Sequence, residues 1–465
     1  MSAAPIRFDV IIVGAGQAGV PLAARFAEAG RRVALIERAH VGGTCVNYGC
    51  TPTKTMVASA RAAHMVRTAG RLGVHVGDVQ VDLAAVVERK NRIVTEWRAG
   101  VERRLERAGD RLTLVRGNAR FVGERLIGVN GTRYTADTIV LNVGARPATP
   151  NVPGLDRVPT LDSTGIMELR ALPEHLIVLG GGYIGCEFGQ MFRRFGAPVT
   201  IVHRGQHLLD REDSDVSVAI EDVFRREGID LRLGVSASTA SADQGGVRLQ
   251  LTDGTAVTGS HALVAVGRVP NTGDLGCAAA NIALDRRGFV TVDDAYRTSA
   301  AGVYAVGDVT GGPQFTHTSW DDHRILFDRL TRDGDGSPAR TRAGRLIPYC
   351  VFTDPQVARV GLSEREAADR GIACEVASMP FGAIARASEL DETAGLLKVL
   401  LDPATERVLG AAIVGIEAGE LIHIFSTLMQ AGASPRAIVD AQAVHPTLAE
   451  GVQSLVMRLD RFALT

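Results

Sequence analysis

The chain has 465 residues, of which 46% are hydrophobic and 22% charged, so it is long enough for about three domains with buried cores. Its formal net charge of −1 gives no electrostatic basis for binding nucleic acid or an anionic membrane. We find no signal-peptide pattern and no uncharged apolar run of membrane-spanning length, and six cysteines are too few for a disulfide scaffold. We therefore expect a cytoplasmic protein, in which a close pair of cysteines is more often catalytic than structural.

The first predicted elements are a strand, a glycine-rich turn, a helix and a second strand, which together cover residues 8–37. The turn carries the pattern GxGxxG at Gly14, Gly16 and Gly19, and the second strand ends at Glu37. Glycines in this pattern let a pyrophosphate approach the backbone at the helix N-terminus, and the acidic residue accepts hydrogen bonds from a ribose. The complete unit therefore predicts a dinucleotide-binding domain.

Two cysteines separated by four residues, Cys45 and Cys50, follow in the stretch GGTCVNYGCTPTK (residues 42–54). Pro52 favours the first turn of a helix that starts here, so Cys50 would lie near a helix N-terminus, where a thiolate is stabilised. We interpret the pair as a redox-active disulfide. Two buried cysteines or half a metal site are the alternatives, but no second Cys or His pair is nearby to complete a zinc site, and we predict no metal.

The middle of the chain repeats the first pattern. Helices are predicted at 53–69 and 83–107. Two apolar segments at 139–147 and 263–270 each end in a glycine followed by a proline three residues later, and they flank a second strand–turn–helix–strand unit at 176–203. We interpret them as the exit from the first domain and the return to it, with two ordinary strand–turn pairs as the alternative.

The second unit carries its own glycine pattern at Gly180, Gly182 and Gly185, so it predicts a second dinucleotide domain. His203 lies 18 residues after the last of these glycines, as Glu37 does in the first unit, and Arg204 follows it. A carboxylate at this position would favour NAD and repel the 2′-phosphate of NADP, whereas a His-Arg pair attracts that phosphate. We therefore predict NADPH, with NADH possible. The alternative is a solvated basic turn with little selectivity.

The C-terminal region has a different pattern. Residues 331–345 are rich in Gly, Asp and Arg and are typical of a linker. Beyond them, a hairpin is predicted from strands at 396–401 and 408–414, and a helix at 420–431. This region is predicted to be α+β, and it contains no GxGxxG pattern, the fingerprint of a dinucleotide site.

Five signatures together resemble the class I flavoprotein disulfide reductases, a family that includes dihydrolipoamide dehydrogenase, glutathione reductase and mercuric reductase. They are the two fingerprints, the cysteine stretch, Gly307-Asp308, and the sequence HPTLAE at 445–450. The resemblance covers the whole chain in the family order, and the stretch around the cysteines is most similar to mercuric-reductase-like proteins. It implies FAD, a nicotinamide cofactor, a small-molecule substrate and a homodimer with no nucleic-acid or membrane partner.

The resemblance also implies the architecture: two Rossmann-like α/β domains, for FAD and NAD(P), and an α+β dimerisation domain. The expected parts are 1–147 for the first part of the FAD domain, 148–270 for the NAD(P) domain, 271–345 for the return to the FAD domain and 346–465 for the interface domain. The implied FAD-binding residues are Gly14, Gly16, Gly19, Glu37, Gly43, Thr44, Lys54, Gly144 and Asp308. The implied NADP-binding residues are Gly180, Gly182, Tyr183, Gly185, His203, Arg204 and Gly267.

The family assigns different tasks to the two cysteines. Cys50 would face the flavin and form the charge-transfer complex, while Cys45 would exchange with the substrate. His445 would take the proton of the attacking thiol, and Glu450 would fix the tautomer of that imidazole. In the family this pair comes from the partner subunit, so each active site would need two chains.

Three further residues are implied near the flavin. Lys54 would pair with Glu187 beside the flavin N5, where it would stabilise negative charge on the reduced ring. Tyr183 resembles a tyrosine that covers the flavin until nicotinamide enters, although an ordinary buried aromatic residue is an equal alternative.

Two departures from the family pattern narrow the predicted substrate and nicotinamide cofactor. The tail at 451–465 lacks the cysteine pair that mercuric reductase uses, and the pair His203-Arg204 argues against the NAD preference of dihydrolipoamide dehydrogenase. We predict an NADPH-dependent flavoprotein that reduces a small disulfide or oxidised-sulfur compound. The alternatives are reduction of mercuric or another soft metal ion, dihydrolipoamide dehydrogenase activity, or a non-enzymatic flavin redox sensor.

Overall fold

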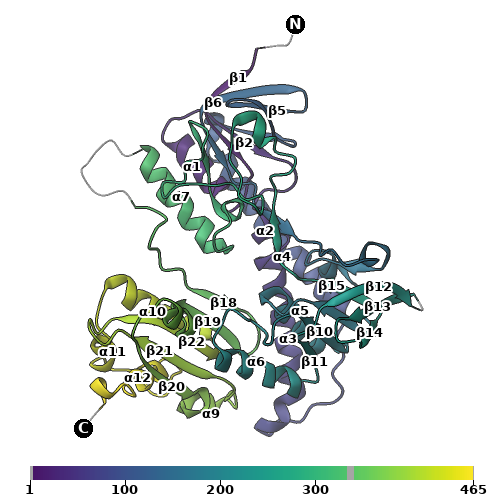
Figure 1. Ribbon diagram of the computed structural model, residues 1–465, viewed down its shortest axis with the longest axis vertical. Helices are drawn as coiled ribbons and strands as arrows, with labels where there is room; N and C mark the ends of the chain where they lie inside the picture. The colour runs from purple at the N-terminus through teal and green to yellow at the C-terminus, as the bar shows by residue number, and fades with distance from the viewer. Residues whose placement is uncertain (1–3, 244, 332–339, 464–465) are drawn as a thin grey trace. The chain divides into compact units, whose positions relative to one another are not determined.

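The computed structural model describes residues 4–243, 245–331 and 340–463, and it divides into two compact units, each built from separate segments of the chain (Figure 1). The first unit holds the described residues of Met1–Thr55, Glu88–Ala148 and Arg268–Arg345. The second holds those of Met56–Val87, Thr149–Gly267 and Leu346–Thr465.

The first unit is built on a sheet in the order β3-β2-β1-β6-β5-β4, with β17 paired to β6. Its strands are β1 (Ile6–Val13), β2 (Val33–Glu37), β3 (Leu112–Arg116), β4 (Arg120–Gly123), β5 (Leu126–Val129), β6 (Thr132–Leu141) and β17 (Val303–Ala305). The pairs that involve β1, β2, β3 and β17 are parallel, and β4, β5 and β6 form an antiparallel extension. The second half of β1 is buried and continuously apolar, as expected for a parallel strand covered on both faces.

Helices cover this sheet and supply the loops at its edge. They are α1 (Gly19–Glu28), α2 (Gly43–Asn47), α7 (Thr316–Thr331), the start of α3 (Cys50–Thr68) and most of α4 (Leu83–Glu106). Figure 1 shows α1 and α7 side by side, and the rings of Phe26 and Phe327 join them with centroids 5.0 Å apart. A core of Val, Ile, Leu and Ala side chains fills the space between these two helices and the sheet.

A short antiparallel ribbon lies beside the main sheet of the first unit. Its strands are β7 (Ala145–Pro147) and β16 (Arg268–Pro270), and Arg146 faces Val269 in the register. These strands end the two similar segments that the sequence indicates as exit and return. Their pairing explains the similarity, because the chain leaves and re-enters the unit at one place.

The second unit contains the second fingerprint in a parallel sheet with the order β11-β10-β9-β15-β8. Its elements are β8 (Thr160–Leu161), β9 (Leu176–Leu179), α5 (Tyr183–Phe195), β10 (Val199–His203), α6 (Ser214–Arg226), β11 (Asp230–Leu233) and β15 (His261–Val264). An antiparallel sheet follows, made of β12 (Ala237–Asp243), β13 (Gly246–Leu251) and β14 (Ala256–Gly259).

The C-terminal part of the second unit is an antiparallel sheet in the order β18-β19-β22-β21-β20 with helices packed on it. Its strands are β18 (Tyr349–Val351), β19 (Gln356–Gly361), β20 (Glu375–Pro380), β21 (Leu396–Leu401) and β22 (Val408–Gly415). Its helices are α8 (Glu364–Asp369), α9 (Ala385–Glu389), α10 (Ala418–Ala431), α11 (Arg436–Val439) and α12 (Glu450–Val456). The predicted hairpin and helix are present, and the predicted fold class is confirmed.

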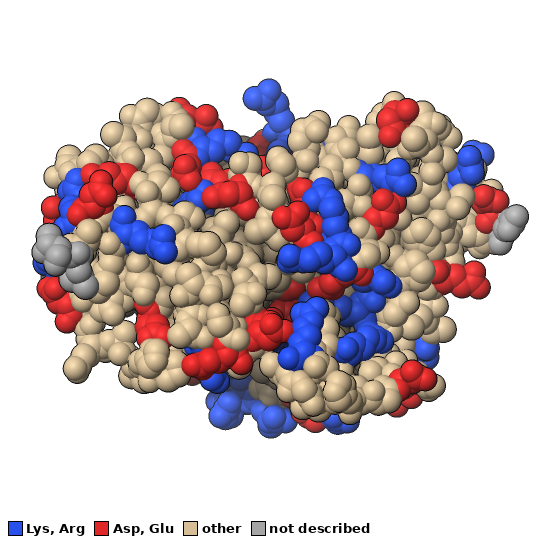
Figure 2. Space-filling model, turned by 90° about the horizontal axis from the view of Figure 1, so that it is seen from below, with Lys and Arg blue, Asp and Glu red and all other residues tan. Residues whose placement is uncertain are grey.

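Two differences from the sequence analysis concern helices. The helix expected at 53–69 begins at Cys50, so the cysteine is its first residue, and α7 was not predicted at all because its sequence is largely polar. The expected linker at 331–345 lies partly outside the described residues. None of the helices in the described residues is long and apolar enough to cross a membrane. Figure 2 shows acidic and basic side chains interspersed on the face it displays, in line with the net charge of −1.

Candidate active site

The first glycine-rich loop is held by contacts that only glycines allow. Gly14 has φ of +101°, and a Cβ there or on Gly19 would overlap a backbone carbonyl oxygen. The loop leads into α1, whose N-terminus has neither a side-chain cap nor an acidic residue in its first turn. The uncapped N–H groups and the positive end of the helix dipole therefore suit an anionic group such as a pyrophosphate.

Two side chains fix this loop against the sheet. Glu37, at the end of β2, accepts hydrogen bonds from the N–H groups of Ala15 and Ala39, each at 2.8 Å. Asn142, just after β6, accepts from the N–H of Gly19 at 2.9 Å and donates to the carbonyl of Val306 at 3.1 Å. Asn142 was not predicted, although a polar residue at the end of an apolar strand was a signal for it.

Asp308 lies in a short 3₁₀ helix, Gly307–Thr310, directly after β17. Burial raises the pKa of Asp308, and the nearby guanidinium of Arg268 opposes that shift. The turn is held from α7 by Asp322, whose carboxylate accepts from the N–H of Gly307 at 2.7 Å and from the hydroxyl of Tyr296 at 2.6 Å. Asp322 is therefore a positioning residue for Asp308, and the sequence alone gave no sign of it.

Cys45 and Cys50 lie together at the start of two consecutive helices. Cys45 is in α2, Cys50 is the first residue of α3, and both are free thiols whose side chains hydrogen-bond to each other. The pKa of Cys45 is raised strongly, first by this hydrogen bond and then by burial and the charge of Cys50. In the reduced pair the proton thus stays on Cys45, and the thiolate belongs on the more exposed Cys50, at the helix N-terminus.

A threonine from α7 completes the cysteine pair. The Oγ1 of Thr316 lies 3.1 Å from the Sγ of Cys50, and a hydrogen bond from Thr316 lowers the pKa of Cys45. The positive charge of Lys54, one turn along α3, acts in the same direction. Thr316 was not predicted, since 266 residues separate it from Cys50.

Lys54 and Glu187 belong to different compact units, so their pairing stays a prediction. Glu187 lies in α5 with only 7% of its surface exposed, and its carboxylate accepts from the N–H of Phe352 at 2.9 Å. Gly144 and Gly267 have φ of +67° and +130° and follow β6 and β15. A Cβ on either glycine would meet nothing within 4 Å, so both leave open space at the ends of their strands.

The second glycine-rich loop repeats the first. Gly180 has φ of +111°, and a Cβ on Gly180 or Gly185 would overlap a backbone carbonyl oxygen. The N-terminus of α5 again has no side-chain cap and no acidic residue in its first turn. A Cβ on Gly182 would meet nothing within 4 Å, so space for a phosphate is open beside this helix end.

His203 takes the place that Glu37 has in the first loop. Its Nδ1 accepts from the N–H of Gly181 at 3.1 Å, and its Nε2 lies 3.4 Å from a carboxylate oxygen of Asp210. Burial lowers the pKa of His203. A ring that accepts at Nδ1 and has a lowered pKa is neutral near pH 7, so the charge for a 2′-phosphate would come from the exposed Arg204.

Tyr183, the first residue of α5, stacks on Tyr349 from β18, with ring centroids 5.8 Å apart and an angle of 29° between the planes. The hydroxyl of Tyr349 in turn hydrogen-bonds to the carboxylate of Glu212. Burial raises the pKa of both tyrosines. The role of Tyr183 over the flavin stays a prediction.

His445 and Glu450 form the contact that the sequence led us to expect. The Nδ1 of His445 lies 2.9 Å from the Oε2 of Glu450, the first residue of α12. The imidazole is 69% exposed, so its other nitrogen is open to an external group. In the described residues, no three His, Cys, Asp or Glu side chains come together in a way that could hold a metal ion.

Comparison with known proteins gives matches along most of the chain. Residues 8–322 match the family model described as pyridine nucleotide-disulphide oxidoreductase, and residues 347–456 match the dimerisation domain of the same family. The chain is 35% identical to the probable pyridine nucleotide-disulfide oxidoreductase RclA of Escherichia coli (strain K12), over 97% of this chain and 98% of the relative. It is 33% identical to a mercuric reductase of Bacillus cereus, over 98% of this chain and 72% of the relative.

A solved structure has the same fold. The Cu(II) complex of the HOCl-induced flavoprotein disulfide reductase RclA from Escherichia coli superposes with a TM-score of 0.88 at 35% identity. The match covers 97% of this chain and 98% of that one.

Proposed function

Because the chain belongs to the pyridine nucleotide-disulphide oxidoreductases, FAD-dependent enzymes that act on sulfur groups, we propose that it uses NADPH to reduce a small disulfide or oxidised-sulfur compound. The observation that carries this proposal is the cluster of Cys45, Cys50 and Thr316. Two thiols in contact, one of them at a helix N-terminus where a thiolate is stabilised, can exchange with a disulfide once a base removes the proton of Cys45.

The residues of the first unit fit FAD. The uncapped N-terminus of α1 would hold the pyrophosphate, Glu37 the adenosine ribose and Asp308 the ribityl chain. When bound, FAD would supply two-electron transfer between a nicotinamide and sulfur. Lys54 and Thr316 would tune the charge beside the cysteines, and Glu187 would orient Lys54.

The residues at the end of β10 support NADPH over NADH. Neutral His203 holds the loop without the negative charge that a carboxylate would bring against a 2′-phosphate. Arg204 is exposed next to it and can pair with that phosphate. A carboxylate oxygen of Asp210 lies 3.4 Å from the Nε2 of the ring.

The cysteines would act in two steps. Deprotonated Cys45 attacks one sulfur of the substrate disulfide, whose S–S bond breaks, so that one thiolate leaves and a mixed disulfide with Cys45 forms. The Cys50 thiolate then attacks the Cys45 sulfur, which closes the Cys45–Cys50 disulfide and releases the second thiolate. Two electrons have then passed from the dithiol to the substrate.

A base is needed because Cys45 holds its proton tightly. We assign this task to His445 of the partner subunit, with Glu450 fixing the tautomer in which the outer nitrogen can accept. The imidazole would take the proton from Cys45 and give it to the first leaving thiolate. This assignment requires a homodimer, in line with the dimerisation domain at 347–456.

The test uses purified, flavin-loaded protein. NADPH and NADH are compared in steady-state assays over a panel of small disulfides, and thiols are counted after anaerobic addition of NADPH. We expect faster turnover with NADPH, two additional thiols per subunit, and loss of activity in Cys45→Ser and Cys50→Ser variants. Turnover that survives in either variant, or NADPH that frees no thiols, would refute the proposal.

A second candidate is reduction of a soft or transition metal ion. The mercuric reductase relative and the Cu(II) complex of RclA favour this candidate. Both findings are about those two proteins and not about this chain. Thiolates bind such ions well, and Cys45 would be the entry ligand. NADPH oxidation dependent on Hg(II) or Cu(II) supports this candidate only if Cys45→Ser abolishes it.

A further inference from the structure

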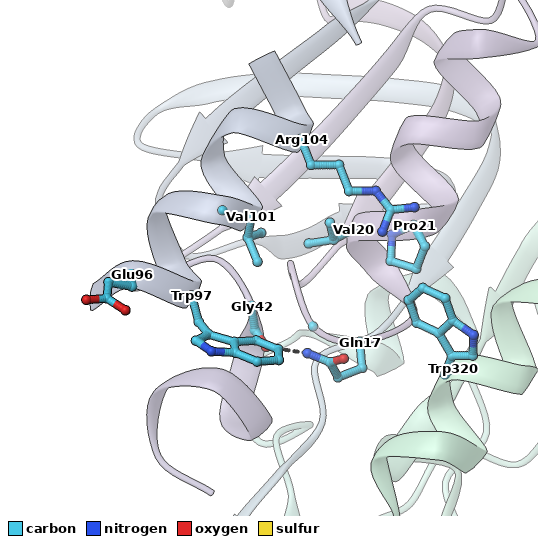
Figure 3. Close-up of a pocket in the computed structure, with 11 residues that line it drawn as sticks. Gln17, Val20, Pro21, Gly42, Glu96, Trp97, Val101, Arg104 and Trp320 are labelled. Carbon is cyan, nitrogen blue, oxygen red and sulfur yellow. Dashed lines mark hydrogen bonds between the residues drawn. The ribbon is translucent and has the colours of Figure 1, made fainter. Parts of the chain in front are cut away.

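The chain contains two tryptophans, and both line one pocket in the first unit (Figure 3). Trp97 comes from α4 and Trp320 from α7, and they are 59% and 41% exposed. Tryptophan is among the more buried residue types on average, so two exposed indoles in one concavity indicate a surface that a ligand covers. The pocket has a volume of about 440 Å³, which is enough for a small organic molecule.

The walls of the pocket are mainly apolar. Val20 and Pro21 from α1 face Val101 from α4, and Figure 3 shows these three side chains above the two indoles, with Gln17 between the rings. Trp320 packs against His323 in a T-shaped arrangement with ring centroids 4.7 Å apart, so the orientation of its ring is fixed in advance. A flat, weakly polar group would therefore find aromatic and aliphatic surfaces ready to receive it.

The cationic lining residue of the pocket is Arg104. The guanidinium of Arg104 lies 5.9 Å from the ring centroid of Trp320, and Figure 3 shows it extending toward Pro21 and Trp320. Among the described residues, no carboxylate forms an ion pair with Arg104. The other charged lining residue, Glu96, points away from Arg104 in Figure 3. The pocket thus offers an available cation that a carboxylate on a ligand can pair with.

The pocket adjoins the loop that leads to the redox cysteines. Gly42 lines it, three residues before Cys45, and the Nε2 of Gln17 donates to the Gly42 carbonyl at 3.0 Å. The Nε of Arg98 on α4 donates to the Oδ1 of Asn47 in α2 at 2.8 Å, which ties the tryptophan-bearing helix to the cysteine helix. A ligand seated in the pocket would therefore lie beside the entry to Cys45.

We propose that this pocket binds the body of the substrate, and that the substrate is a disulfide carrying an aromatic ring and a carboxylate. The ring lies against Trp97 and Trp320, and the carboxylate pairs with Arg104. This inference rests on the proposed disulfide reduction. The flavin is a less suitable occupant, because of the residues expected to bind it only Gly16 lines the pocket.

Binding is tested without turnover by tryptophan fluorescence, since the only two indoles of the chain line the pocket. Flavin-loaded Cys45→Ser protein is titrated with naphthoate and, for comparison, with uncharged naphthylmethanol. We expect saturable quenching by both compounds, with a Kd about tenfold lower for naphthoate. Arg104→Gln should remove this difference. Arg103→Gln is the control and should keep it, because Arg103 is an exposed neighbour on α4. Equal and non-saturable quenching by both compounds would overturn the inference.

Turnover then tests the substrate class. We expect Arg104→Gln to lower kcat/KM about tenfold for dithiobis(nitrobenzoate) and to leave uncharged dithiodipyridine nearly unchanged. Trp97→Leu and Trp320→Leu should each lower kcat/KM about fivefold for both aromatic disulfides and leave aliphatic dithiodipropionate unaffected. Equal losses for all three compounds, or a change in the oligomeric mass of the tryptophan variants, would overturn the inference. Naphthoate binding with no disulfide turned over would instead refute the proposed function.

Discussion

The two glycine-rich loops of this chain share one geometry and differ in charge at one position. In both, a strand ends in a glycine with positive φ, and the fingerprint closes at a glycine whose Cβ would overlap a carbonyl oxygen. In both, the end of the second strand accepts a hydrogen bond from the loop. Glu37 accepts from Ala15, and His203 accepts from Gly181.

The residue at the end of the second strand of each unit has two separate roles. An acceptor at the end of the second strand is needed to hold the loop, and either a carboxylate or a neutral imidazole supplies it. The charge of that acceptor is free to vary, and it acts on the ribose side of the bound nucleotide. His203 therefore keeps the loop in place while it removes the negative charge that Glu37 brings to the first site.

The largest effect should come from breaking each loop in turn. Gly19→Ala and Gly185→Ala both drive a Cβ into a backbone oxygen, which should cost about 3 kcal/mol locally. We expect Gly19→Ala to yield protein without flavin, seen as loss of visible absorbance. Gly185→Ala should keep the flavin but lower kcat/KM for NADPH about a hundredfold. Gly273→Ala, where a Cβ meets nothing within 4 Å, is the control, and loss of flavin in Gly185→Ala would contradict the separation.

Exchanging the acceptor should change cofactor preference next most strongly. His203→Glu restores a carboxylate that can still accept from Gly181, so the loop and the flavin content should be preserved. The ratio of kcat/KM for NADPH to that for NADH should fall about a hundredfold, because the carboxylate repels the 2′-phosphate and accepts from a free ribose hydroxyl. An unchanged ratio would show that the residue at this position does not determine the preference between NADPH and NADH.

Removing the neighbouring charge should have a smaller effect. Arg204→Gln should raise KM for NADPH about tenfold and leave KM for NADH within about twofold, since only the phosphorylated cofactor loses a partner. Arg226→Gln serves as the matched control, because Arg226 is also exposed but is the last residue of α6. Equal changes for the two cofactors would mean that Arg204 acts on the fold of the loop instead.

The sequence predicted what depends on short stretches of chain. The fingerprints, the presence of a helix after the cysteines and the contact of His445 with Glu450 all follow from residues close in sequence. Asn142 and Thr316 were missed because their partners lie 123 and 266 residues away. Helix α7, which supplies Thr316 and Asp322, was missed because its polar sequence has no clear apolar face. The domain boundaries, the cytoplasmic location and the homodimer stay predictions.

The smallest expected effect concerns pH and depends on the neutral state of His203. Burial lowers its pKa in the folded protein, so the unfolded chain binds this proton more tightly than the folded chain does. The stability linked to His203 is therefore fully present above the ordinary histidine pKa of about 6.5 and is lost as the pH falls toward the lowered value. His203→Asn keeps an acceptor for Gly181 but cannot take up a proton in this range.

We expect the melting temperature of this variant, measured against pH, to fall less steeply below pH of about 6.5 than that of the unmodified protein. His64, His175 and His323 also have lowered pKa values, so the difference between the two curves, and not either curve alone, isolates His203. Glu37 offers the contrast, because Glu37→Gln keeps an acceptor for Ala15 and changes no histidine, so the difference expected for His203→Asn near pH 6 should be absent in this variant. Parallel curves for the unmodified protein and His203→Asn would mean that the imidazole is not held neutral by the loop, and the comparison of the two sites would lose its physical basis.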